Sequence, residues 1–197
     1  MRLETGSNLT IDNKKVSIQV KLGGRYFSAD NIALPERTEH VEFVVDTPRV
    51  ILAPRSEVSL DTAGDLLRIA GKACRSNEQS VCSELQADIV AVMAIDSAAL
   101  RSIAALDGVA ISFTTPLLDM RHCNEHCLTM DVAGNLCYAR LFDNGMRCAE
   151  AFDVANSDDI LYIATEWLDN RDIPIYIKGA TDAVKVLRKY YKRVICE

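Results

Sequence analysis

The sequence predicts an α/β protein in which one order of strands and helices occurs twice. Two tight-turn signals, Ala133-Gly134-Asn135 and Asp143-Asn144-Gly145, divide residues 127–154 into three short strands. Such turns need positive φ at their centre, which glycine and asparagine tolerate. The apolar run DIVAVMAID at 88–96 is typical of a strand covered on both faces. Patterns of helix, strand, helix and strand follow the first strands in each half, so we expect βββαβαβ twice.

The first half is expected to begin with a strand over 16–22, where apolar and polar residues alternate. Gly23 and Gly24 then turn the chain into a second strand. Ser97 is expected to cap a helix. The other elements expected in this half are strands over 41–45, 50–54, 88–96 and 109–114 and helices over 61–74 and 97–106.

The second half continues from the three strands into a helix that begins at Asn156 or Ser157. Thr181 is expected to cap a last helix that runs to Tyr191, and strands are expected before and after it. The inward positions expected on these two helices are Ile160, Leu161, Ala164, Trp167, Leu168, Val184, Leu187 and Tyr191.

Length and composition indicate a soluble globular protein with one large domain or two small ones, and the repeated order of elements divides it into halves at 1–118 and 119–197. The chain has 197 residues, of which 49% are hydrophobic and 25% charged, so wholesale disorder is excluded. Its formal net charge of −6 argues against a dedicated nucleic-acid binder. No apolar run approaches the ~20 residues that span a bilayer. Residues 1–15 form a polar lead-in without the apolar core of a signal peptide.

Seven cysteines are present, an odd number, and several lie within apolar strand patterns. With no export signal, they are interpreted as reduced thiols of a cytoplasmic protein.

Several segments resemble an uncharacterised Bacteroidetes family that has an actin-like ATPase fold. They are VEFVVDTPRVILAP at 41–54, DIVAVMAID at 88–96, FTTPLL at 113–118 and SDDILYIATEW at 157–167. The resemblance implies two ribonuclease-H-like βββαβαβ halves with mixed five-stranded sheets and a cleft between them. The segments are core strands and helix starts, so they indicate a fold far better than an activity.

The resemblance also implies where ATP and Mg²⁺ would bind. In active members of the superfamily, a glycine turn in each half cradles the phosphates, and an acidic residue beside each turn holds the metal or positions water. The matching positions are Gly23 and Gly24 in the first half and Asp131 and Gly134 in the second. Gly179 matches the turn against which the adenosine packs.

The first strand lacks the acidic residue that hydrolysis needs, because Gln19 and Lys21 stand at the matching positions. We therefore expect no catalytic residues. The leading hypothesis is a non-catalytic interaction or scaffold protein with a degenerate nucleotide cleft and an unidentified protein partner. One alternative is a divergent Mg-ATP-binding protein or weak ATPase. Another is an RNA-contacting accessory protein, on account of five cations and two tyrosines within 185–193. The sequence carries no signal for oligomeric state.

Residues 122–127, HCNEHC, hold four metal-ligand side chains. On a helix, His122 and His126, or Cys123 and Cys127, would share a face. A zinc ribbon needs a second, distant pair, which the sequence lacks. The interpretation is an exposed linker without a metal, and nothing in the pattern favours a cysteine nucleophile.

Overall fold

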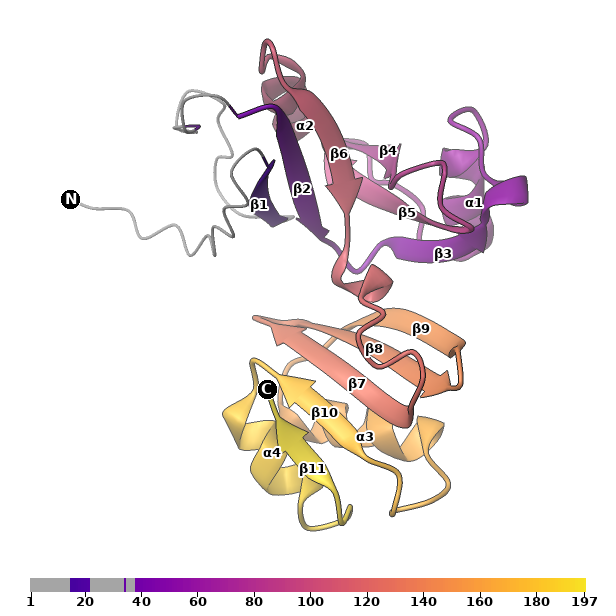
Figure 1. Ribbon diagram of the computed structural model, residues 1–197, viewed down its shortest axis with the longest axis vertical. Coiled ribbons are helices and arrows are strands. Elements are labelled where there is room, and N and C mark those ends of the chain that lie inside the picture. Colours follow the sequence, from indigo (N-terminus) through magenta and orange to yellow (C-terminus); the bar gives the residue numbers. More distant parts are fainter. Residues whose placement is uncertain (1–14, 22–33, 35–37) are drawn as a thin grey trace, which may run out of the picture. The chain divides into compact units, whose positions relative to one another are not determined.

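The computed structural model describes residues 15–21, 34 and 38–197. The chain divides into two compact units, Met1–Thr115 and Pro116–Glu197, which are described separately (Figure 1). Residues 116–118, which the sequence analysis placed in the first half, thus belong to the second unit. The α/β class is confirmed. None of the described helices is both long enough and apolar enough to cross a membrane.

One mixed five-stranded sheet forms the centre of the second unit. The strands β7 (His126–Ala133), β8 (Leu136–Asp143) and β9 (Met146–Asp153) pair antiparallel in sequence order. β10 (Ile175–Lys178) is parallel to β7, and β11 (Val194–Cys196) is parallel to β10. The order across the sheet is therefore β11-β10-β7-β8-β9. The predicted βββαβαβ order and five-stranded mixed sheet are confirmed in this unit.

Both predicted turns of this sheet have the backbone that their residues favour. Gly134, in the two-residue turn between β7 and β8, has a φ of 64°. Asn144 and Gly145, between β8 and β9, have φ of 50° and 139°. Positive φ at these positions matches the right-handed twist of the paired strands.

Two helices, α3 (Ser157–Trp167) and α4 (Thr181–Leu187), pack against one face of the sheet (Figure 1). All eight predicted inward residues are buried in this core or packed against it, although Tyr191 lies just beyond the end of α4. Buried residues of this core from the strands and helices include Leu128, Met130, Cys137, Ala139, Ile160, Ala164, Ile175, Ile177, Val184 and Leu187.

The starts of the two helices differ from each other. Asn156 is the N-cap of α3, and its side chain accepts hydrogen bonds from the backbone N–H groups of Asp158 and Asp159. The prediction that Thr181 caps α4 is wrong, because Ala180 is the N-cap and makes no side-chain bond. α4 also ends at Leu187 rather than Tyr191. The residues from 188 to 191 form hydrogen-bonded turns instead of a helix.

The opposite face of the same sheet carries polar residues. Because side chains alternate along a strand, Cys127, Thr129 and Asp131 of β7 point away from the helices. The 3₁₀ helix η3 (Pro116–Leu118) contacts β8 and β9, and Leu117 is fully buried.

The first unit differs from its prediction. Its described strands form two sheets of three strands, so the expected single five-stranded sheet is not present in residues 15–21 and 38–115. β1 (Lys15–Lys21), β2 (His40–Asp46) and β6 (Ala110–Thr114) are parallel, in the order β1-β2-β6. The strand expected after Gly23 and Gly24 lies outside the described residues.

The second sheet of this unit is antiparallel, with the order β3-β5-β4. β5 (Ile89–Asp96) is the predicted buried strand, and it pairs on both sides with β3 (Val50–Pro54) and β4 (Glu78–Cys82). No strand was expected at β4, because its five residues, EQSVC, hold little apolar signal. Its pairing with β5, rather than its own pattern, makes it a strand.

Short helices connect these strands. η2 (Arg55–Glu57) and α1 (Ala63–Ile69) follow β3, and α1 is much shorter than the predicted 61–74. α2 (Ser97–Ala104) follows β5, and its cap is Asp96 rather than the predicted Ser97. The Asp96 carboxylate accepts hydrogen bonds from the backbone N–H groups of Ala98 and Ala99.

Candidate functional site

The structure brings two predicted cofactor residues, Gly134 and Gly179, to one pocket of the second unit. The pocket has a volume of about 350 Å³ and lies where β7 and β10 end and α3 begins. Ser157 at the start of α3 and Thr181 at the start of α4 also line it. Gly23 and Gly24, predicted for the first half, lie outside the described residues.

Gly179 is required by the packing of the backbone. Its φ is 83°, and a Cβ atom added there would lie 2.0 Å from the carbonyl oxygen of Val132. Any other residue would push β7 away from the turn that follows β10. Gly134 has a positive φ but no atom within 4 Å of an added Cβ, so only the backbone conformation selects glycine there.

The N-terminus of α3, which borders the pocket, is already satisfied by its own side chains. Asn156 Oδ1 accepts hydrogen bonds from the N–H groups of Asp158 and Asp159 at 2.7 Å and 3.3 Å. Asp159 Oδ2 in turn accepts from the N–H groups of Ala155 and Asn156 at 2.6 Å and 3.2 Å. This capping box uses donors that a phosphate would need, and it adds a negative charge beside them.

Asp131 lies on the opposite face of the sheet from the pocket and is paired with a buried cation. Arg140 is 2% exposed, and its Nη2 donates to Asp131 Oδ2 at 2.5 Å. Arg140 Nε donates to Thr129 Oγ1 at 2.8 Å, and its Nη1 donates to the Pro116 carbonyl oxygen. The guanidinium thus joins β7, β8 and η3.

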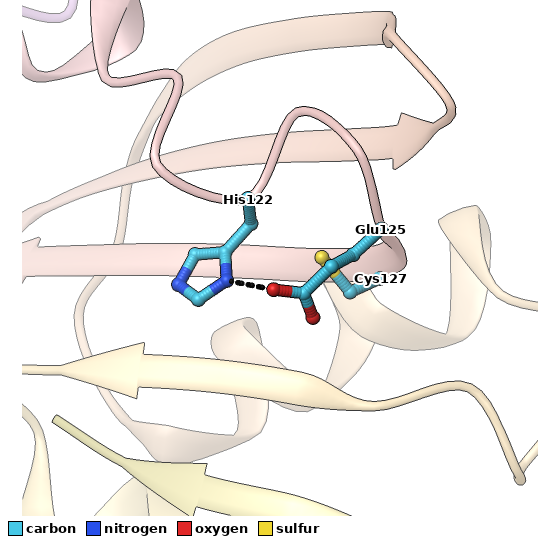
Figure 2. Close-up of side chains that lie close together, drawn as sticks. All are labelled: His122, Glu125 and Cys127. Atoms are coloured by element: carbon cyan, nitrogen blue, oxygen red, sulfur yellow. Dashed lines mark hydrogen bonds and ion pairs between the residues drawn. The ribbon is translucent and has the colours of Figure 1, made fainter.

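A third group of side chains lies near the start of β7. His122, Glu125 and Cys127 each offer a metal-ligand atom, and these atoms lie within 4.8 Å of one another (Figure 2). The chain is a turn before β7 rather than a helix, so the predicted helical pairs do not form. Because a turn leads into a strand here, the chain brings together His122 from one predicted pair, Cys127 from the other, and Glu125.

Hydrogen bonds and burial set the protonation of this group. Burial lowers the pKa of His122, but hydrogen bonds from its ring to Glu125 and Glu197 outweigh burial and raise it. Burial raises the pKa of the Cys127 thiol to about 11, and the charge of Glu125 adds to this rise. An ionised imidazolium and a neutral thiol follow at mildly acidic pH.

Comparisons with known proteins reveal the fold. No family model and no curated protein matches the sequence. A solved structure from Bacteroides thetaiotaomicron, described as a protein with actin-like ATPase fold and unknown function, matches 80% of this chain and 68% of its own. The TM-score is 0.66 at 16% identity. This chain has the actin-like ATPase fold.

Two further solved structures align with most of this chain at lower TM-scores. One is the AlfA filament bound to AMPPNP, with a TM-score of 0.39 and 12% identity over 80% of this chain and 52% of that one. The other is the PilM-PilN type IV pilus biogenesis complex, with a TM-score of 0.44 and 11% identity over 82% and 70%. The Bacteroides structure, at its TM-score of 0.66, confirms as a likeness of fold the resemblance stated from the sequence.

The basic segment near the end of the actin-like chain is partly neutralised within the second unit. Lys185 pairs with Asp182 at 3.1 Å, and Lys192 pairs with Asp172 at 2.8 Å. Arg188 donates to the carbonyl oxygen of Val194 at 3.2 Å. These contacts give three of the five cations structural partners, and RNA contact stays a prediction.

Proposed function

We propose that this actin-fold chain is a non-catalytic protein that acts by binding another protein. The observation that supports this most is the engagement of Asp131 by the buried Arg140 guanidinium. A Mg²⁺ ion held by Asp131 would sit beside that fixed positive charge. Like charges 4 Å apart repel by on the order of 4 kcal/mol per pair of unit charges near a protein surface.

The sequence of the first unit supports the same proposal. Gln19 and Lys21 occupy the positions on β1 where an active member of the superfamily carries an acidic residue. Phosphoryl transfer depends on positioned metal and water, and both depend on carboxylates. A chain with one candidate carboxylate, itself paired with arginine, lacks the charges that hydrolysis requires.

Phosphate release from Mg-ATP tests the absence of catalysis. We expect the full chain and an Asp131→Asn variant to release phosphate at the same background rate. Turnover by the wild-type chain that Asp131→Asn abolishes would overturn the proposal. Circular dichroism of both proteins shows that the comparison is made between folded chains.

Cross-linked co-purification from the native cell tests the partner. Large apolar side chains exposed on the described surface, Leu60, Ile69 and Tyr162, are suited to contact with a protein. We expect a stoichiometric partner that a serine substitution at one of these positions weakens. A chain that purifies alone at every protein concentration tested would contradict an interaction role.

Nucleotide binding without hydrolysis is a second candidate, favoured by the pocket that joins Gly134 and Gly179. Its volume of about 350 Å³ is within the range of small-ligand sites. A saturable rise of melting temperature with ATP, lost in Ala155→Trp at the pocket and kept in the exposed control Ala104→Trp, would support this function. Equal melting curves with and without ATP would exclude it.

A further inference from the structure

We propose that His122, Glu125 and Cys127 form a binding site for a borderline divalent metal ion, with zinc as the best match. Their ligand atoms lie within 4.8 Å of one another (Figure 2). Zinc bonds of 2.0–2.3 Å place tetrahedral ligands roughly 3.3–3.8 Å apart. Side-chain adjustments on the order of 1 Å would therefore close the three donors around one ion.

The imidazole of His122 is oriented for this role. Nδ1 lies 2.8 Å from Glu125 Oε1 and faces the other donors, whereas Nε2 lies 2.9 Å from Glu197 Oε1. A histidine that binds metal through one nitrogen commonly donates the N–H of the other to a carboxylate, which fixes its tautomer. Glu197 has the position of that carboxylate.

Tyr176 holds the other side of the site. Its ring stacks on His122 with centroids 4.0 Å apart and planes 20° apart. Its hydroxyl donates to Glu125 Oε2 at 2.8 Å, so Glu125 Oε1 remains directed at His122 Nδ1 and the rest of the cluster. Two of the three proposed ligands therefore have hydrogen-bonding partners that would orient them when metal is bound.

The site is built on the sheet rather than on a loop alone. Cys127 is fully buried on β7, and Tyr176 lies on the adjacent parallel strand β10. The Glu125 N–H donates to the His122 carbonyl at 3.0 Å, and the Glu197 N–H donates to the Ile177 carbonyl at 3.0 Å. Backbone bonds thus hold His122 and Glu197 next to the strands that carry their partners.

The donor chemistry selects the metal. A nitrogen, a carboxylate oxygen and a sulfur suit zinc, whereas magnesium and calcium prefer oxygen donors alone. A thiolate and a carboxylate would carry two negative charges, which Zn²⁺ balances, and binding would release the thiol proton of Cys127. Three protein ligands leave the fourth tetrahedral position for water or for a partner's side chain.

Titration of the chelator-treated full chain with Co²⁺ and Zn²⁺ tests the proposal. We expect one ion per chain, a thiolate-to-cobalt charge-transfer absorption, and release of a proton on binding. Cys127→Ser should abolish the absorption. Tyr176→Phe, which keeps the ring and removes one hydrogen bond, should weaken binding by about 10–100-fold.

Cys123→Ser and His126→Ala are matched controls, because both residues lie within the same six-residue segment but outside the cluster. We expect both to bind as the wild-type chain does. Absence of the charge-transfer absorption in the folded wild-type chain would overturn the proposal, as would equal uptake by Cys127→Ser and wild type. Should Cys127→Ser fail to fold, Glu125→Gln replaces it, and unchanged affinity in that variant would overturn the proposal equally.

Discussion

The two faces of the five-stranded sheet are stabilised in different ways. On the helix-covered face, Leu128 and Met130 pack into an apolar core with α3 and α4. On the opposite face, the alternate residues Cys127, Thr129 and Asp131 lie in charged clusters. Burial of apolar area stabilises the first face, whereas partners for polar groups must be supplied on the second.

The carboxylates on this charged face have two different kinds of positive partner. Asp131 has a permanent cation, because arginine stays protonated at every relevant pH. Glu125 and Glu197 instead flank His122, whose charge depends on pH and which can also bind metal as a neutral ring. The Asp131 corner is therefore a structural ion pair, whereas the proposed metal ion could replace the proton of His122 at the other corner.

Replacement of the permanent cation should have the largest effect. Arg140→Met leaves Asp131 and Thr129 without their buried partner, so we expect the free energy of unfolding to fall by about 3–5 kcal/mol. Urea denaturation measures the loss. The exposed Arg147→Met is the control and should change stability by less than about 0.5 kcal/mol. Addition of Asp131→Asn to Arg140→Met should restore part of the loss, and wild-type stability of Arg140→Met would show that the face needs no fixed cation.

The strands and helices of the second unit could be predicted well, because the residues that mark their turns and starts act locally in the sequence. Two Gly and Asn turns fix the antiparallel strands, and Asn156 marks the start of α3. The pairing of Asp131 was missed because Arg140 lies on the adjacent strand, two positions out of register, and no periodicity reports such a contact. The grouping of His122, Glu125 and Cys127 was not predicted because the segment was tested against helical spacing, whereas the chain turns and enters a strand at His126.

The first unit was predicted less well because its sheet pairing is not local. β2 and β3 are separated by three residues yet belong to different sheets. The strand β6 pairs with β2 across more than sixty residues of intervening chain. Alternation of apolar and polar residues predicts a strand but does not predict which strand pairs with it. Strand existence was therefore predictable for most of this unit, whereas the partners of each strand were not.

Substitution of the pocket glycine tests the backbone contact at the edge of the helix-covered face. Gly179→Ala forces a positive φ on alanine and puts Cβ against the Val132 carbonyl. The expected loss of stability exceeds that of Gly134→Ala, for which left-handed backbone strain alone predicts about 1–2 kcal/mol. Chemical denaturation of the two variants makes the comparison. Equal losses would show that the turn relaxes and that Val132 does not select glycine.

Removal of the α3 cap should have a smaller effect on the same face. Asn156→Ala leaves the N–H groups of Asp158 and Asp159 without their acceptor, and we expect a loss of about 1 kcal/mol. Thermal denaturation measures it. Asn156→Asp keeps an acceptor oxygen and should stay within a few tenths of a kcal/mol of wild type. A destabilised aspartate variant would mean that the pocket edge rejects a further negative charge near Asp159.

The pH dependence of the metal-free chain should be the smallest effect, and it separates the exchangeable cation from the permanent one. Hydrogen bonds to Glu125 and Glu197 raise the folded-state pKa of His122 above about 6.5, despite opposing burial. The folded chain therefore binds this proton more tightly than the unfolded chain. The resulting stabilisation is complete below about pH 6.5 and is lost as pH rises through the raised pKa.

Urea denaturation in the presence of chelator, across this pH range, measures that loss. His122→Gln should flatten the profile, whereas the neighbouring His126→Gln should keep it. Added zinc should reverse the trend, because a rising pH removes protons that compete with metal for His122 and Cys127. A profile that is the same with and without zinc would show that zinc does not bind at His122 and Cys127.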